Sequence, residues 1–202
     1  MWLRMDAVEI RRMQTGEPNQ LAYLTSLAFQ NHPMYEAIFQ LSGEELRKII
    51  EQDYLDMYAN WPHETFVAIN NGRIIGGIRS GSCTGNWHSG VSYSEGEYEY
   101  IINHKIEELT TLQREKWLES TCESHDIDIP HSHVGPIVVL PEFQGKGVGS
   151  LLLEDYFSRL DGGISFLETF TESNVRFYRN RGYRVIATDF VLGIKGYWMI
   201  RD

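Results

Sequence analysis

Two short stretches of the sequence carry residues whose types and spacing could do chemistry. The first is PEFQGKGVGS at 141–150, in which glycine stands at every second position from 145 to 149. It lies between an apolar stretch and a predicted amphipathic helix. A glycine turn in that place exposes several backbone N–H groups at a helix N-terminus, where the helix dipole also favours an anion. The loop is therefore predicted to bind phosphate.

Two familiar phosphate loops fit this stretch poorly. A Walker A loop needs lysine directly after its last glycine, but Lys146 stands between glycines and Ser150 comes too late. A dinucleotide loop reads G-x-G-x-x-G, whereas the third glycine here comes one residue early. The acidic residue that could follow, Glu168, lies inside a predicted strand rather than at its end. Neither nucleotide-binding fold is predicted.

The second stretch is His131-Ser132-His133, at the start of the apolar stretch. Strand alternation places both imidazoles on one face, and histidine is the usual residue for proton transfer at neutral pH. The alternative is a pair of half-exposed histidines at a strand edge. Because no third ligand stands at a plausible spacing, no metal site is predicted.

The elements that must position these residues can be predicted from hydrophobic periodicity. A strand is predicted at 8–13, and helices at 21–32 and 42–58, the first ending at His32–Pro33. Asn71–Gly72 between two apolar runs predicts a hairpin over 66–78 with a type I′ turn. Further elements are predicted as a strand at 134–140, a helix at 151–160, a strand at 164–170, a short helix at 173–181 closed by Gly182, and two final strands at 183–188 and 194–200.

Residues 85–130 differ from the rest. A polar helix is predicted at about 97–121, and the segment carries a net charge of −7, most of the −10 of the whole chain. Two interpretations stay open: a solvated helix face, or a lid that attracts a cation.

Composition limits the class of protein. A net charge of −10 is a poor basis for binding nucleic acid, which depends on neutralising phosphates. No secretory signal or membrane-spanning run is recognisable, and Cys83 and Cys122 are expected to be reduced thiols. We therefore expect a cytoplasmic protein of one domain with no nucleic-acid or membrane partner.

The glycine stretch Gln144-Gly145-Lys146-Gly147-Val148-Gly149 resembles the Q/R-x-x-G-x-G/A loop of the GNAT family of N-acetyltransferases, whose amides hold the pyrophosphate of acetyl-CoA. Residues 174–183 resemble the same family's N-V-x-F-Y-x-x-x-G-[FY] segment. The predicted order of elements also agrees with this family.

The resemblance implies the α/β GNAT fold: a mixed, mostly antiparallel sheet flanked by helices, forming a single domain over 1–202. The helical segment 85–130 would be an insert between strands three and four, over the substrate side. It further implies that the pantetheine arm binds backbone groups of Val138 and Leu140, while the amide of Val139 faces the thioester oxygen. The implied cofactor-binding residues are Val138, Val139, Leu140, Gln144, Gly145, Lys146, Gly147, Val148, Gly149, Ser150 and Asn174.

For the catalytic residues, Tyr178 matches the family's frequent general acid; the alternative is a core aromatic. His131 and His133 resemble a histidine pair of the serotonin N-acetyltransferase branch, where such a pair helps to remove the amine proton. Glu168 is a reserve base, or else a structural carboxylate.

The expected activity is acetyl transfer from acetyl-CoA to a primary amine by direct attack. Because the 85–130 insert is acidic, a small cationic amine is expected as the acceptor. No metal is expected, and the resemblance is compatible with a homodimer. Two alternatives remain: an acyltransferase that uses another acyl-CoA or a protein N-terminus, and a non-catalytic CoA-binding module.

Overall fold

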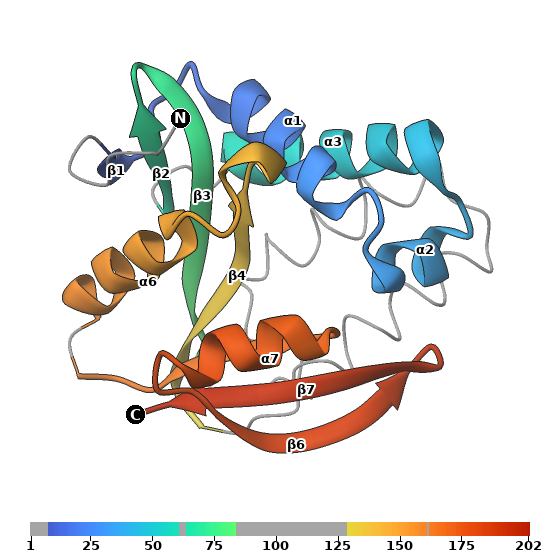
Figure 1. Cartoon of the computed structure of the whole chain (residues 1–202), viewed down its shortest axis with the longest axis vertical. Coiled ribbons are helices and arrows are strands. Elements are labelled where there is room, and N and C mark those ends of the chain that lie inside the picture. Colours follow the sequence, from blue (N-terminus) through green and yellow to red (C-terminus); the bar gives the residue numbers. More distant parts are fainter. Residues whose placement is uncertain (1–7, 61–63, 84–128, 161) are drawn as a thin grey trace. The chain divides into compact units, whose positions relative to one another are not determined.

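The computed structural model describes residues 8–60, 64–83, 129–160 and 162–202 (Figure 1). Their strands form a seven-stranded mixed sheet in the order β1-β2-β3-β4-β5-β7-β6. β4 and β5 are parallel, whereas the pairs β1–β2, β2–β3, β5–β7 and β6–β7 are antiparallel. The sheet and its flanking helices agree with the predicted fold class. The predicted insert helix lies outside the described residues.

The chain divides into two compact units. The first unit consists of Met1–His32, Ser42–Gly81 and Val134–Asp161, and the second of Pro33–Leu41, Ser82–His133 and Gly162–Asp202. The prediction of a single domain stays a prediction. Among the helices of the described ranges, none has both the length and the apolar character needed to cross a membrane.

The first unit carries the N-terminal strands and the predicted hairpin. Asn71 and Gly72 have φ angles of 50° and 74°, which confirms the expected type I′ turn. α1 packs on α3, and α6 packs on β1 and β2 (Figure 1). The elements of this unit are β1 Val8–Arg12, α1 Pro18–Phe29, α3 Gly43–Asn60, β2 Thr65–Asn70, β3 Arg73–Cys83, β4 His131–Val139, the 3-10 helix η4 Pro141–Phe143, and α6 Val148–Arg159. The unit includes β3 only as far as Gly81 and β4 only from Val134.

Two adjacent glycines allow neighbouring elements to pack closely against both faces of β3. A Cβ atom built on Gly76 would lie 2.8 Å from the carbonyl oxygen of Val138, and one on Gly77 would lie 2.6 Å from Cδ1 of Leu21 in α1. Because successive residues of a strand face opposite sides, the two positions belong to opposite faces. The main chain of β4 and a side chain of α1 thus approach β3 as closely as only glycine allows.

His32 stands just beyond the end of α1, and its ring lies edge-on to Phe29 with the ring centroids 5.4 Å apart. Burial lowers the pKa of His32 from 6.5 to about 4. The folded chain therefore keeps this ring neutral at pH values where the unfolded chain protonates it.

We expect this difference to make the protein less stable as the pH falls. Between pH 6.5 and pH 4 the unfolded state binds one more proton at His32, so the free energy of unfolding should fall with acidification, by up to about 3 kcal/mol. Urea unfolding of the wild type and of His32→Gln at several pH values measures this contribution. The variant should show a shallower pH slope; identical slopes would contradict the expectation.

The second unit contains α2 Pro33–Phe39, β5 Ser165–Thr169, α7 Glu172–Arg179, β6 Arg184–Val191 and β7 Ile194–Arg201, together with the first three residues of β4. β7 lies between β5 and β6 in the sheet order, and α7 packs on β6 (Figure 1). At the start of β4, Ser132 pairs with Ser165 and His133 with Phe166. This pairing places the start of β4, which carries both histidines, beside β5.

One helix was not predicted, and several helix and strand bounds differ from the sequence prediction. His32–Pro33 was expected only to end a helix, but Pro33 is also the first residue of α2, a position that suits proline because its missing N–H is not needed there. β4 begins at His131, three residues earlier than predicted. Both histidines therefore lie at the start of the strand, as the alternation argument requires.

Candidate active site

The glycine loop of the first unit joins the end of β4 to the start of α6. Gly145 and Gly147 have φ angles of 70° and 88°, in the left-handed region that residues with a Cβ avoid. Gly147 is the N-cap of α6 and brings no side chain to cap the helix. Among the described residues no side chain caps this helix start, and its first amides and its dipole suit an anion.

Hydrogen bonds within the first unit hold the loop in place. The Gln144 side chain donates to the carbonyl of Val139 at 3.0 Å, so it ties the loop to the end of the strand. The amide of Leu140 donates to the carbonyl of Ile75 at 2.9 Å, and the carbonyl of Leu140 accepts from the amide of Phe143 at 2.8 Å. Both backbone groups of Leu140 are thus engaged inside the unit.

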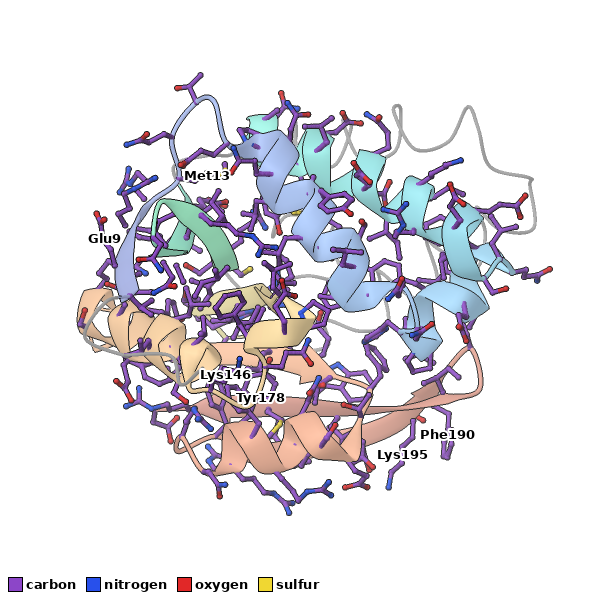
Figure 2. The ribbon with its side chains drawn as sticks, turned by 45° about the horizontal axis from the view of Figure 1, so that its top comes forward. Glu9, Met13, Lys146, Tyr178, Phe190 and Lys195 are labelled. Carbon is purple, nitrogen blue, oxygen red and sulfur yellow. The ribbon has the colours of Figure 1, made fainter. Side chains whose placement is uncertain are left out.

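The other residues predicted to bind the cofactor differ in their solvent exposure. Val138 and Val148 are buried and anchor the two ends of the loop, while Ser150 lies in the first turn of α6 and its amide donates to the carbonyl of Gly147 at 3.0 Å. Lys146 is exposed, and its ammonium lies 5.3 Å from the ring centroid of Phe143 (Figure 2). The loop therefore offers one positive charge beside its amides.

In the second unit, His133 on β4 and Glu168 on β5 form a direct contact. Nε2 of the imidazole lies 2.8 Å from Oε2 of the carboxylate, and the two side chains are 10% and 19% exposed. A carboxylate only accepts a hydrogen bond, so Nε2 of His133 carries a proton. The register explains the contact: Phe166 pairs with His133, and Glu168 stands two residues further along the same face of β5.

His131 makes a different contact. Its Nδ1 lies 2.6 Å from the carbonyl oxygen of Ile129, which can only accept, so Nδ1 carries the proton. Nε2 is buried and has no hydrogen-bond partner among the residues that the structure describes. Burial also lowers the pKa of His131, so this ring is neutral at pH 7.

The two imidazoles share one aromatic neighbour. The Phe166 ring centroid lies 5.1 Å from that of His131 and 5.7 Å from that of His133. Each histidine is only 8% exposed, which corrects the alternative of two half-exposed histidines at a strand edge. The parallel partner strand β5 and its Phe166 cover them, and a single sequence does not reveal that pairing.

Tyr178 lies on α7 (Figure 2) and is partly buried. Its ring meets those of Phe177 and Tyr183 edge-on, at centroid distances of 5.1 and 5.7 Å. Burial raises the pKa of Tyr178, and the negative charge of Glu168 raises it further. The phenol therefore stays protonated at neutral pH. Within the described ranges its hydroxyl makes no hydrogen bond.

Asn174 stands in the first turn of α7, with its side chain exposed. Its backbone N–H points to the hydroxyl of the N-cap residue Thr171, at 3.4 Å. The helix start is thus capped by this side chain, in contrast to the uncapped start of α6.

The structure therefore brings the predicted site residues together in two sets, each within its own unit. The first set is the loop with the end of β4, and the second is His131, His133, Glu168 and Tyr178. β4 carries members of both sets, the histidines at its start and Val138 and Val139 at its end. Sequence reasoning named every member but missed the contact between His133 and Glu168. In the described part of the chain, no three His, Cys, Asp or Glu side chains are grouped so that they could hold a metal ion.

Comparison with known proteins points to one class. The sequence model of the acetyltransferase (GNAT) family matches residues 35–183. No curated protein sequence matches the chain.

Solved structures share its fold at low sequence identity. The paiA N-acetyltransferase from Thermoplasma acidophilum in complex with coenzyme A is 15% identical, with a TM-score of 0.61 over 96% of this chain and 98% of that one. The polyamine N-acetyltransferase of Drosophila melanogaster, which forms N-acetylagmatine, is 16% identical, with a TM-score of 0.61 over 96% and 98%. The histone acetyltransferase HPA2 and related acetyltransferase from Corynebacterium glutamicum is 12% identical, with a TM-score of 0.68 over 96% of each chain.

Proposed function

The chain belongs to the acetyltransferase (GNAT) family, and on that premise we propose that it transfers the acetyl group of acetyl-CoA to the primary amine of a small cationic molecule. It is an acyltransferase, and acetyl-CoA is its co-substrate. The observation that carries the proposal is the uncapped N-terminus of α6, preceded by two glycines in the left-handed region.

The loop suits the pyrophosphate of acetyl-CoA. Backbone amides at the start of α6 donate to phosphate oxygens, and the left-handed glycines Gly145 and Gly147 allow the chain to present these amides on one side. Lys146 adds a positive charge. Because both backbone groups of Leu140 are engaged, we assign the pantetheine arm to Val138 and Val139, with the amide of Val139 facing the thioester oxygen. Asn174 is a further contact to the cofactor.

The residues of the second unit suit the two proton transfers. The amine nitrogen attacks the thioester carbonyl carbon, a C–N bond forms, and the C–S bond breaks. A basic side chain of this unit takes the proton that the amine must lose, and Tyr178 gives a proton to the departing sulfur of CoA. His131, His133 and Glu168 are the candidates for the first step. Holding the two reactants in line supplies much of the remaining acceleration.

Two observations support a cationic acceptor. Residues 85–130 carry a net charge of −7 in the sequence, which would attract a cation. The polyamine and agmatine acetyltransferases with this fold are named for cationic amines. Their identity to this chain is 16% in each case, so the likeness supports the fold and the acceptor stays a proposal.

A thiol-release assay with acetyl-CoA tests the proposal across polyamines, agmatine, aminoglycosides, amino acids and peptides. We expect the highest kcat/KM for a small cation with a primary amine. A preference for a peptide N-terminus or for a longer acyl-CoA would favour the second candidate chemistry. CoA binding without amine-dependent thiol release would mean a non-catalytic module.

The acidic segment gives a separate prediction. Replacing Glu107, Glu108, Glu115 and Glu119 by glutamine should raise KM for the best cationic amine several-fold while leaving KM for acetyl-CoA unchanged, because it removes negative charge from the segment. The increase should shrink at high salt, where charges are screened. Unchanged KM for the amine at low salt would remove the segment from acceptor recognition.

A further inference from the structure

The two histidines of β4 are held in opposite protonation patterns, although one serine separates them. From this we infer that Glu168 is a positioning residue: it fixes His133 with the ring proton on Nε2, so that Nδ1 of His133 accepts the amine proton, while His131 does not act as the base. The inference rests on the proposed function, because it divides the roles of residues named there.

The contact between His133 and Glu168 has the features of an orienting pair. The 2.8 Å distance is that of a charge-assisted hydrogen bond, and both side chains are largely withdrawn from water. A carboxylate on Nε2 leaves the lone pair of the neutral ring on Nδ1. When Nδ1 takes a proton, the carboxylate already lies beside the new positive charge and stabilises it. Glu168 therefore acts on the base through its position beside the ring, without touching the amine.

His131 lacks this arrangement. Its ring proton is held on Nδ1 by the Ile129 carbonyl, so the basic nitrogen is Nε2, and that atom is buried without a hydrogen-bond partner in the described ranges. Protonating this nitrogen would create a buried imidazolium. The hydrogen-bond acceptor of that imidazolium is a main-chain carbonyl and not a carboxylate. Burying a charge without a charged partner is costly. His131 is therefore a poor base.

Glu168 also connects the base to the proposed acid. Its negative charge acts on Tyr178 and disfavours loss of the phenol proton, while Arg181 acts in the opposite direction. The same carboxylate thus favours a charged imidazolium at His133 and keeps Tyr178 protonated before the transfer, although it opposes the loss of the phenol proton itself. A carboxylate that served as the base itself would lose its charge during the reaction and could not have both effects.

Nitrogen NMR of the histidine rings tests the first part without any substrate. In the wild type, His133 should show a protonated Nε2 and an unprotonated Nδ1, and His131 the reverse, because the two ring nitrogens of a neutral imidazole are distinct. Glu168→Ala should abolish the fixed pattern at His133 and leave His131 unchanged. A wild-type His133 with its proton on Nδ1 would overturn the inference.

Kinetics with acetyl-CoA and the best amine test the second part. Glu168→Ala and His133→Gln should each lower kcat by about 10²-fold, the usual scale of general-base catalysis, and leave KM for acetyl-CoA within about twofold. Combining the two changes should cost little more than either alone, because they remove one function. Glu168→Gln keeps an oxygen that accepts from Nε2, so it should retain at least about a tenth of the wild-type kcat.

The glutamine variant separates the two roles of Glu168. If Glu168 were the base, glutamine would be as damaging as alanine, because an amide takes up no proton, and that result would overturn the inference. Glu172→Gln is the matched control: it removes another carboxylate of the second unit, one that accepts a hydrogen bond from Tyr197, and it should leave kcat unchanged. If no amine is acetylated, the proposed function fails, while the NMR measurement still decides the ring protonation.

Discussion

Tyr178→Phe should lower kcat for acetyl transfer by about 10²-fold or more, with little change in KM for acetyl-CoA. The substitution removes one hydroxyl and keeps the ring that packs against Phe177 and Tyr183. The departing sulfur of CoA would then have to leave as a thiolate or take its proton from water. Steady-state thiol release, measured together with the melting temperature, checks this result.

The pH dependence of kcat provides a second test of the Tyr178→Phe variant. Because burial and Glu168 raise the pKa of Tyr178, the wild-type enzyme should keep the acid protonated beyond the pH at which an ordinary phenol loses its proton. Any alkaline decline in kcat that belongs to this phenol should be absent from Tyr178→Phe. An unaltered kcat across the whole pH range would remove Tyr178 from the mechanism.

Tyr183→Phe is the matched control for the loss of a phenol hydroxyl. Tyr183 is buried in the same unit, and its hydroxyl lies 2.5 Å from that of Ser165. Removing it should lower the free energy of unfolding by about 1–2 kcal/mol, because the buried Ser165 hydroxyl loses a partner. It should leave kcat essentially unchanged. The control therefore distinguishes an effect of lower fold stability on kcat from the loss of the general acid.

Gly147→Val should raise KM for acetyl-CoA by at least about tenfold. A residue with a Cβ at a φ of 88° pays at least about 1–2 kcal/mol, and relaxing to a negative φ would turn the first amides of α6 away from the phosphates. Calorimetric titration with CoA measures this directly, since CoA carries the same pyrophosphate as acetyl-CoA. An unchanged dissociation constant would mean that the loop does not hold the phosphates.

Gly162→Val controls for backbone strain alone. Gly162 also has a positive φ, 66°, and no atom of the described residues lies within 4 Å of the Cβ that would be added there. It stands outside the glycine loop, between α6 and β5. The variant should lose a similar amount of stability and bind CoA as the wild type does.

The parts of the fold that depend on local chemistry could be predicted from the sequence. Asn71–Gly72 predicts its turn because both residues tolerate positive φ. The glycine loop predicts a turn that exposes backbone N–H groups at the start of a helix. Pro33 shows the limit of such signals. A proline both ends one helix and suits the first turn of another, and the sequence around it does not decide between the two.

The candidate site could be predicted only as separate residues. That His133 meets Glu168 depends on the register of two parallel strands, and no local pattern encodes a register between segments more than thirty residues apart. The protonation of His131 likewise depends on the path of the chain at Ile129. Two histidines that look equivalent in the sequence therefore acquire different chemistry only after folding.

The adjacent glycines of β3 differ in how freely they could change during evolution. The obstacle at Gly77 is the end of a flexible side chain, Leu21, which a smaller residue at position 21 would remove. The obstacle at Gly76 is the main-chain oxygen of Val138, which no substitution removes. As the sequence diverges, positions 77 and 21 are therefore free to change together, whereas Gly76 has no single partner whose change could release it.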